Sequence, residues 1–177
     1  MTMKNILIGC SLVALSSASA WAEGSSQRAW AEIKDASGKT VGAAVLTEQH
    51  DGVLINLKVS GLKPGAHAFH VHETGECTGP DFKSAGGHFN PFHKHHGTKN
   101  PEGKHAGDMP NLEVQPDGSA KASVVAEGTT LAPGAASLLK PGGTALIIHA
   151  SPDDNVSDPA GNAGARVACG VIRAKAE

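Results

Sequence analysis

The chain has 177 residues, a formal net charge of −2 and only 3% aromatic residues. This length is typical of one domain with a hydrophobic core of its own. The basic residues form no run and are not interleaved with aromatic residues, which argues against a nucleic-acid-binding protein. The sequence contains no internal repeat, second domain or low-complexity linker.

The first 22 residues have the pattern of a secretory signal peptide. Lys4 supplies the positive charge, residues 6–15 form an apolar core, and small residues typical of a cleavage site follow near residue 20. The apolar run is too short to span a membrane, so no stable membrane association is expected. We therefore predict export, to a bacterial periplasm or, as the alternative, into the medium.

Cleavage near Trp21 or Glu23 would leave a mature domain over residues 23–177. A lipid anchor on Cys10 is the weaker alternative, because very few apolar residues precede that cysteine. Removal of the leader leaves two cysteines, Cys77 and Cys169. In an oxidising compartment such a pair is expected to form a disulfide, and two buried free thiols are the alternative.

The mature sequence is dominated by short runs with strand character. Residues 53–59 alternate in polarity directly after the turn signal Asp51-Gly52, so this turn and its flanking runs predict a hairpin. No segment shows a sustained 3.6-residue apolar period. We predict an all-β antiparallel sandwich or flattened barrel in which two connections are long. The eight expected strands cover residues 28–35, 40–48, 53–59, 66–72, 111–115, 119–126, 144–150 and 166–173.

Histidines are concentrated in one stretch of the chain, where eight of the ten lie between His67 and His105. Neutral imidazole is the commonest side-chain ligand of transition metals. In His70-Val71-His72, strand alternation places both imidazoles on one face, which makes half of a metal site on a rigid element. The stretch therefore predicts metal binding.

A long loop rich in glycine and proline follows this half-site. Such a loop needs something to hold it, and three histidines with one carboxylate satisfy a tetrahedral zinc site. We predict that the loop folds around its own zinc ion. His95 adjoins His96 and is the alternative ligand, and otherwise His93 and His95 are expected on the loop surface. The predicted ligands are His88, His96, His105 and Asp108.

Two later residues extend the candidate site. His149 ends an apolar strand, where a lone histidine is usually a surface residue, but the His70 and His72 half-site lacks further ligands and favours a ligand role here. Arg166 follows a glycine-rich loop over residues 161–165. A surface salt bridge is the alternative role for this arginine.

Five motifs occur together, in one order, over nearly all of the mature chain. They are His70-Val71-His72, Gly86-Gly87-His88-Phe89-Asn90-Pro91, His105-Ala106-Gly107-Asp108, His149 and Gly161-Asn162-Ala163-Gly164-Ala165-Arg166-Val167-Ala168-Cys169-Gly170-Val171-Ile172. Each motif alone is weak, but the combination resembles the copper/zinc superoxide dismutases. The resemblance implies an eight-stranded Greek-key β-sandwich or flattened barrel with long metal-binding and active-site loops.

The resemblance also implies a role for each candidate residue. Arg166 matches the family's anion-guiding arginine, and Cys77 with Cys169 matches its intrasubunit disulfide. Asp153 matches the carboxylate that links ligands of the two metals, with the adjacent Asp154 as the alternative. The implied copper ligands are His70, His72, His88 and His149. The implied zinc ligands are His88, His96, His105 and Asp108, so that His88 bridges the two ions.

The implied activity is superoxide dismutation, in which superoxide becomes oxygen and hydrogen peroxide through redox cycling of a copper ion. The zinc ion is a structural and tuning cofactor. His88, as a proton carrier, and Arg166, which orients the anion, are the implied catalytic residues. A homodimer is the assembly considered, although relatives associate through different surfaces.

Two other functions compete with this interpretation. One is a non-catalytic copper/zinc buffer or metal-delivery protein on the same scaffold, which would not need Arg166. The other is a zinc hydrolase or hydratase with a three-histidine site, which would leave a bridging His88 unexplained.

Overall fold

The computed structural model describes residues 27–175, and the predicted signal peptide over residues 1–22 lies outside this range. The described backbone consists of short strands and one 3-10 turn, η1 (Lys83–Ala85), so the all-β prediction is confirmed. No helix within residues 27–175 is long and apolar enough to cross a membrane. The strands are β1 (Arg28–Asp35), β2 (Thr40–Glu48), β3 (Gly52–Val59), β4 (Gly65–His67), β5 (Phe69–His72), β6 (Leu112–Val114), β7 (Ala120–Glu127), β8 (Ala145–His149), β9 (Arg166–Val171) and β10 (Arg173–Ala174).

One curled antiparallel sheet contains most of these strands, in the order β5-β8-β9-β1-β2-β3-β7, with β10 paired to β1. Strands β4 and β6 form a separate two-stranded sheet. The predicted hairpin is confirmed, because β2 and β3 pair in register from Gly42 opposite Val59 to Glu48 opposite Val53. Crossover connections then place β8 beside β5, and this pairing positions the candidate site.

The core lies on the concave face of the sheet. In β1, Ala29, Ala31 and Ile33 are buried while the residues between them face outward, as alternation in a half-buried strand requires. Strand β8 is buried on both faces, which explains its continuous apolar sequence. Leu146 and Ile148 face the main core, whereas Ile147 packs in a smaller cluster around Phe82 and Cys169.

Two predicted strands are each divided in the structure, so there are ten strands instead of eight. The segment 66–72 breaks at Ala68, because the residues before it pair with β6 and those after it pair with β8. At the break, the Ala68 N–H donates to the Ser151 carbonyl. The segment 166–173 breaks at Ile172 between β9 and β10. The other strands begin and end within one residue of the predicted positions.

The predicted disulfide is confirmed between Cys77 and Cys169, with Cα atoms 5.7 Å apart. It joins the loop after β5 to β9 across a sequence separation of 92 residues. Closing a loop of this length stabilises the fold by about 4–5 kcal/mol in the chain-entropy model. The disulfide therefore holds the loop that leads to η1 against the sheet.

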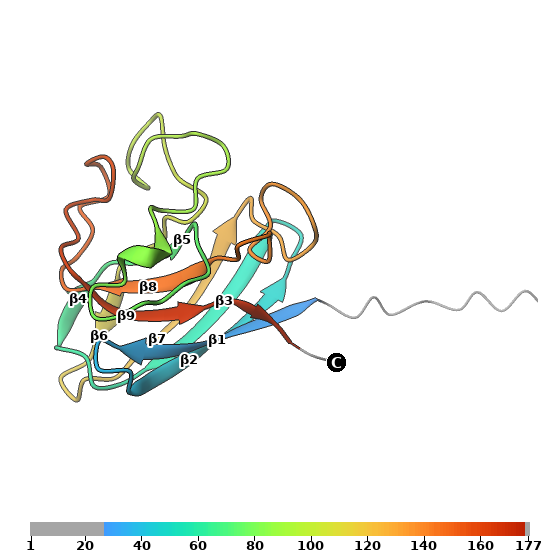
Figure 1. Cartoon of the computed structure of the whole chain (residues 1–177). Coiled ribbons are helices and arrows are strands. Elements are labelled where there is room, and N and C mark those ends of the chain that lie inside the picture. Colours follow the sequence, from blue (N-terminus) through green and yellow to red (C-terminus); the bar gives the residue numbers. More distant parts are fainter. Residues whose placement is uncertain (1–26, 176–177) are drawn as a thin grey trace, which may run out of the picture.

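Two long loops stand together at one end of the sheet, drawn yellow-green and red-brown in Figure 1. Direct contacts join them. The Thr98 hydroxyl donates to Oδ1 of Asn155 at 2.8 Å, and the Lys99 N–H donates to the Asn155 carbonyl at 3.1 Å. This end of the sheet carries the candidate site.

Candidate metal centre

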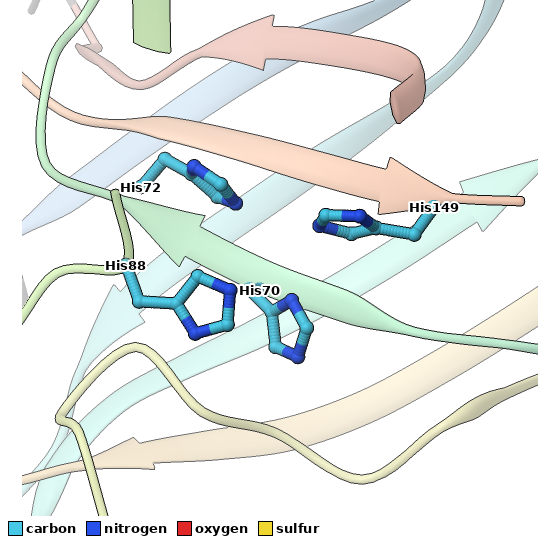
Figure 2. A group of neighbouring side chains, drawn as sticks. All are labelled: His70, His72, His88 and His149. Atoms are coloured by element: carbon cyan, nitrogen blue, oxygen red, sulfur yellow. The ribbon is translucent and has the colours of Figure 1, made fainter. Parts of the chain in front are cut away.

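Strand β5 brings two histidines beside the end of β8. His70 and His72 lie on β5, and pairing with β8 places His149 at the end of the neighbouring strand. His88 joins them from a loop, through a bridge to His72. Figure 2 shows the rings of His72 and His149 pointing toward one another. One ligand atom from each of these four residues, hereafter the four-histidine group, lies within 4.8 Å of the others, and all four are buried.

A second group starts at His88 and continues along the loop. We call His88, His96, His105 and Asp108 the three-histidine-aspartate group; their ligand atoms also lie within 4.8 Å of one another. Oδ1 of Asp108 is 2.8 Å from Nδ1 of His88 and 3.1 Å from Nδ1 of His96. Oδ2 accepts hydrogen bonds from the backbone N–H groups of Gly97 and His105, which leaves Oδ1 to face the three imidazole rings.

Close backbone packing explains how Asp108 reaches this position. Gly107 lies so near β5 that a Cβ there would overlap the Val71 carbonyl oxygen. The Val71 N–H also donates to the Gly107 carbonyl at 3.0 Å, and Asp108 forms a bridge to His70. Only glycine permits this approach, so the sequence Gly107-Asp108 delivers the carboxylate to the histidines.

One ring nitrogen of each of these six histidines is buried and has no hydrogen-bond partner among the described residues. Leaving a buried polar atom unpaired costs about 1–3 kcal/mol, so six such atoms in one place need compensation. Metal ions supply it: four imidazoles suit copper, and three imidazoles with one carboxylate suit zinc. The unpaired atoms are Nδ1 of His70, His96 and His105 and Nε2 of His72, His88 and His149.

Burial keeps three of these imidazoles neutral. It lowers the pKa of His72 to about 2, that of His149 to about 3 and that of His88 to about 4, in the last case against the hydrogen bond with Asp108. Burial alone would raise the pKa of Asp108, but the close imidazoles of His105, His88 and His96 outweigh it and hold the pKa below its usual range. Neutral imidazoles and an ionised carboxylate are the forms that bind metals.

Asp153 connects the two groups. Its Oδ2 lies 2.6 Å from Nε2 of His70, and its Oδ1 lies 3.0 Å from Nε2 of His96. Gly161 packs directly against this carboxylate, with no room for a Cβ. The side chain of the neighbouring Asp154 instead accepts hydrogen bonds from the backbone N–H groups of Val156 and Ser157. The structure therefore places Asp153, and not Asp154, between the groups.

Arg166 stands beside the four-histidine group, since it pairs with His149 across β8 and β9. Its guanidinium donates from Nη1 to the Phe82 carbonyl at 2.7 Å and from Nη2 to the Gly86 carbonyl at 2.6 Å. Within residues 27–175 it forms no ion pair with a carboxylate. The surface salt bridge considered above is absent from the described part of the chain, and the charge is held by two backbone carbonyls instead.

The structure separates His95 from its neighbour His96. His96 is fully buried at the three-histidine-aspartate group, whereas His95 is exposed and its Nδ1 lies 2.6 Å from Oδ2 of Asp158. Asn111 is a site residue that sequence reasoning missed. Its side chain exchanges two hydrogen bonds with the backbone of Asp153, at 2.8 and 3.0 Å. No local pattern marks Asn111, because the two residues meet only through the fold.

Comparison with known proteins gives the family. A family model described as copper/zinc superoxide dismutase (SODC) matches residues 40–172. The chain belongs to the copper/zinc superoxide dismutase family. The matched range contains every member of both groups, as well as Asp153 and Arg166.

Relatives within this family cover most of the chain. "Superoxide dismutase [Cu-Zn] 2" of Aquifex aeolicus is 55% identical over 148 residues, which are 82% of this chain and 86% of the relative. The crystal structure of a SOD-like protein from Bacillus subtilis has a TM-score of 0.78 and 41% identity, and covers 80% of this chain and 96% of that one. Cu/Zn superoxide dismutase from Brucella abortus has a TM-score of 0.66 and 32% identity, and covers 82% and 99%.

Proposed function

We propose that the protein is an exported superoxide dismutase. Two superoxide anions and two protons give one oxygen molecule and one hydrogen peroxide. The observation that carries the proposal is the set of six unpaired, buried imidazole nitrogens, arranged as two groups that share His88. The substrate and the two cofactors are those in the name of the family.

The residues divide into two ligand sets. Copper, when bound, supplies the one-electron oxidation and reduction that dismutation requires. A zinc ion does not change its oxidation state, so its site holds His88 in place. We assign copper to the four-histidine group (His70, His72, His88 and His149) and zinc to the three-histidine-aspartate group (His88, His96, His105 and Asp108).

Two residues act on the substrate and its protons. Arg166 places a positive charge beside the four-histidine group, where it binds and orients the superoxide anion. Nε2 of His88 would hold copper when the ion is bound, and the same atom can carry a proton to the reduced product. In the structure Nδ1 of His88 lies 2.8 Å from Oδ1 of Asp108, on the other side of the ring from Nε2. Asp153 orients His70 and His96 through their outer nitrogens.

Family membership alone leaves room for a storage or delivery protein, since one relative is named only superoxide dismutase-like. Storage of copper needs ligands but no cation that guides a substrate. In this chain the guanidinium of Arg166 is fixed by two carbonyls next to a complete set of four histidines. This combination favours catalysis.

Residues 1–22 are proposed to act as a signal peptide that delivers the mature protein to the periplasm. The Cys77–Cys169 disulfide agrees with an oxidising compartment. A homodimer stays a prediction, which light scattering on the mature protein tests through the measured mass. Amino-terminal sequencing of the exported protein tests the cleavage site.

The activity test compares three preparations of the mature protein: metal-free, zinc-loaded, and loaded with both copper and zinc. Superoxide consumption is measured together with metal content. The proposal expects rapid consumption only in the preparation with both metals, in proportion to copper. A fully loaded protein without activity would instead favour metal storage, and ester hydrolysis by the zinc-loaded protein would favour a hydrolase.

A further inference from the structure

Glu73, the residue directly after His72, contacts Gly87 through both backbone polar groups of that glycine. The Glu73 N–H donates to the Gly87 carbonyl at 2.9 Å. In return, the Gly87 N–H donates to Oε1 of the Glu73 side chain at 2.9 Å. Glu73 has no part in either metal group, so these contacts need a separate explanation.

The peptide unit between Gly86 and Gly87 has a second set of contacts at its opposite end. A trans peptide unit is planar, and its C=O and N–H point in opposite directions. While the N–H contacts Glu73, the Gly86 carbonyl accepts from Nη2 of Arg166 at 2.6 Å and from Nδ1 of His72 at 3.0 Å. One carbonyl oxygen has two lone pairs and can accept both donors. This single peptide unit therefore orients a copper-ligand candidate and the anion-binding arginine.

Nothing in the two glycines themselves fixes the direction of this unit. Neither residue has a Cβ, and Gly86 adopts a positive φ of 73°, so rotation of the peptide plane meets little steric resistance. The hydrogen bond from Gly87 to the carboxylate resists this rotation. Because it is charge-assisted it is stronger than a neutral one, and it polarises the peptide so that its carbonyl becomes a better acceptor.

We propose that Glu73 is a positioning residue whose carboxylate fixes the Gly86–Gly87 peptide unit, so that the Gly86 carbonyl holds Arg166 and His72 in their working orientations. The inference rests on the proposed function, because those orientations matter through copper and its anionic substrate. Glu73 touches neither the substrate nor a ligand atom.

The test must separate the hydrogen bond from the negative charge, because an exposed carboxylate near the site also acts on an approaching anion. Glu73→Gln removes the charge and keeps an oxygen that can accept the Gly87 N–H. Glu73→Ala removes both. Glu76→Ala is the matched control: Glu76 is also exposed on the same loop, and the bond it accepts comes from Thr78.

The first readout is hydrogen exchange of the Gly87 amide, measured by NMR in the metal-free protein. The second is the azide affinity of the copper- and zinc-loaded protein, followed by visible absorption, because azide is an anion that can occupy the substrate position. In Glu73→Ala we expect faster Gly87 exchange and azide binding weakened about 3- to 10-fold, the equivalent of one lost hydrogen bond. Glu73→Gln, which keeps a neutral acceptor, should show a smaller change than Glu73→Ala in both measurements, and Glu76→Ala should remain within about twofold of the wild type.

Three outcomes would overturn the proposal. One is wild-type azide affinity and Gly87 exchange in Glu73→Ala. Another is an equal change in Glu73→Gln and Glu73→Ala, which would assign the effect to charge. The third is an equal change in Glu76→Ala, which would assign it to the loop in general. If the wild type consumes no superoxide, the proposed function fails, and Gly87 exchange in the metal-free protein still decides the role of Glu73.

Discussion

Nδ1 of His88 lies 2.8 Å from Oδ1 of Asp108, while Nε2 of the same ring is buried and unpaired at the four-histidine group. The two ring nitrogens of one imidazole therefore belong to two different ligand sets. The hydrogen bond to Asp108 fixes the plane of the ring and leaves Nε2 available on the other side. A proton at Nε2 can consequently be gained or lost without displacing the ring.

Replacement of Arg166 should slow superoxide consumption without removing copper. We expect Arg166→Ala to lower the second-order rate constant by at least about tenfold, because local positive charge raises the capture rate of anions by 10-fold or more. The matched control is Arg173→Ala on β10, which removes the same charge outside the site. Pulse radiolysis at several ionic strengths measures both variants, and equal rates in the two would contradict the role of Arg166.

Asp153 and Asp154 provide a matched pair of carboxylates. Asp153→Asn should weaken zinc affinity by about 10- to 100-fold, because this carboxylate contacts Nε2 of His96 as well as Nε2 of His70. Asp154→Asn should leave affinity nearly unchanged, since Asp154 accepts hydrogen bonds from Val156, Ser157 and Asn162, which belong to neither metal group. Competition with a zinc-binding dye measures both, and the reverse order of effects would exclude the assignment of Asp153.

The metal-free protein should be most stable near pH 6.5. Burial lowers the folded-state pKa of His72, His149 and His88 to about 2, 3 and 4, while the unfolded chain binds these protons near pH 6.5. Below pH 6.5 the unfolded state therefore binds more protons, and each histidine reduces the free energy of unfolding by about 1.4 kcal/mol per pH unit.

His96 produces the decline on the alkaline side. Burial alone would lower its pKa, but the close carboxylates of Asp108 and Asp153 outweigh this and raise the pKa to about 9. The contribution of protonated His96 to the free energy of unfolding is complete below pH 6.5 and is lost as the pH rises through 9. Urea midpoints at acidic, near-neutral and alkaline pH test this profile, and a midpoint that continues to rise on acidification below pH 6.5 would contradict it.

Loss of the disulfide should affect both stability and activity. Cys77→Ser should reduce the free energy of unfolding by about 2–5 kcal/mol. Activity should also fall, because the loop after Cys77 carries the Phe82 and Gly86 carbonyls that hold Arg166. Urea unfolding and superoxide consumption measure the two effects. The reduced wild type is the control and should match the variant, whereas full activity in both would show that the loop keeps its position without the disulfide.

The strands and ligand candidates were predictable because their signals are local. Alternation marked β3, the Asp51-Gly52 turn signal marked its hairpin with β2, and the His70-Val71-His72 spacing placed two imidazoles on one face. The break at Ala68 was not predictable, because it arises where the chain changes its pairing partner from β6 to β8. The roles of Asn111 and Glu73 depend on contacts with residues 42 and 14 positions away, which no sequence motif marks.

Anomalous diffraction at the copper and zinc absorption edges, on crystals of the mature protein loaded with both metals, tests the central assignment most directly. We predict copper at the four-histidine group, zinc at the three-histidine-aspartate group, and His88 between them. Zinc alone in both positions after loading with both metals, or copper bound away from His149, would contradict it.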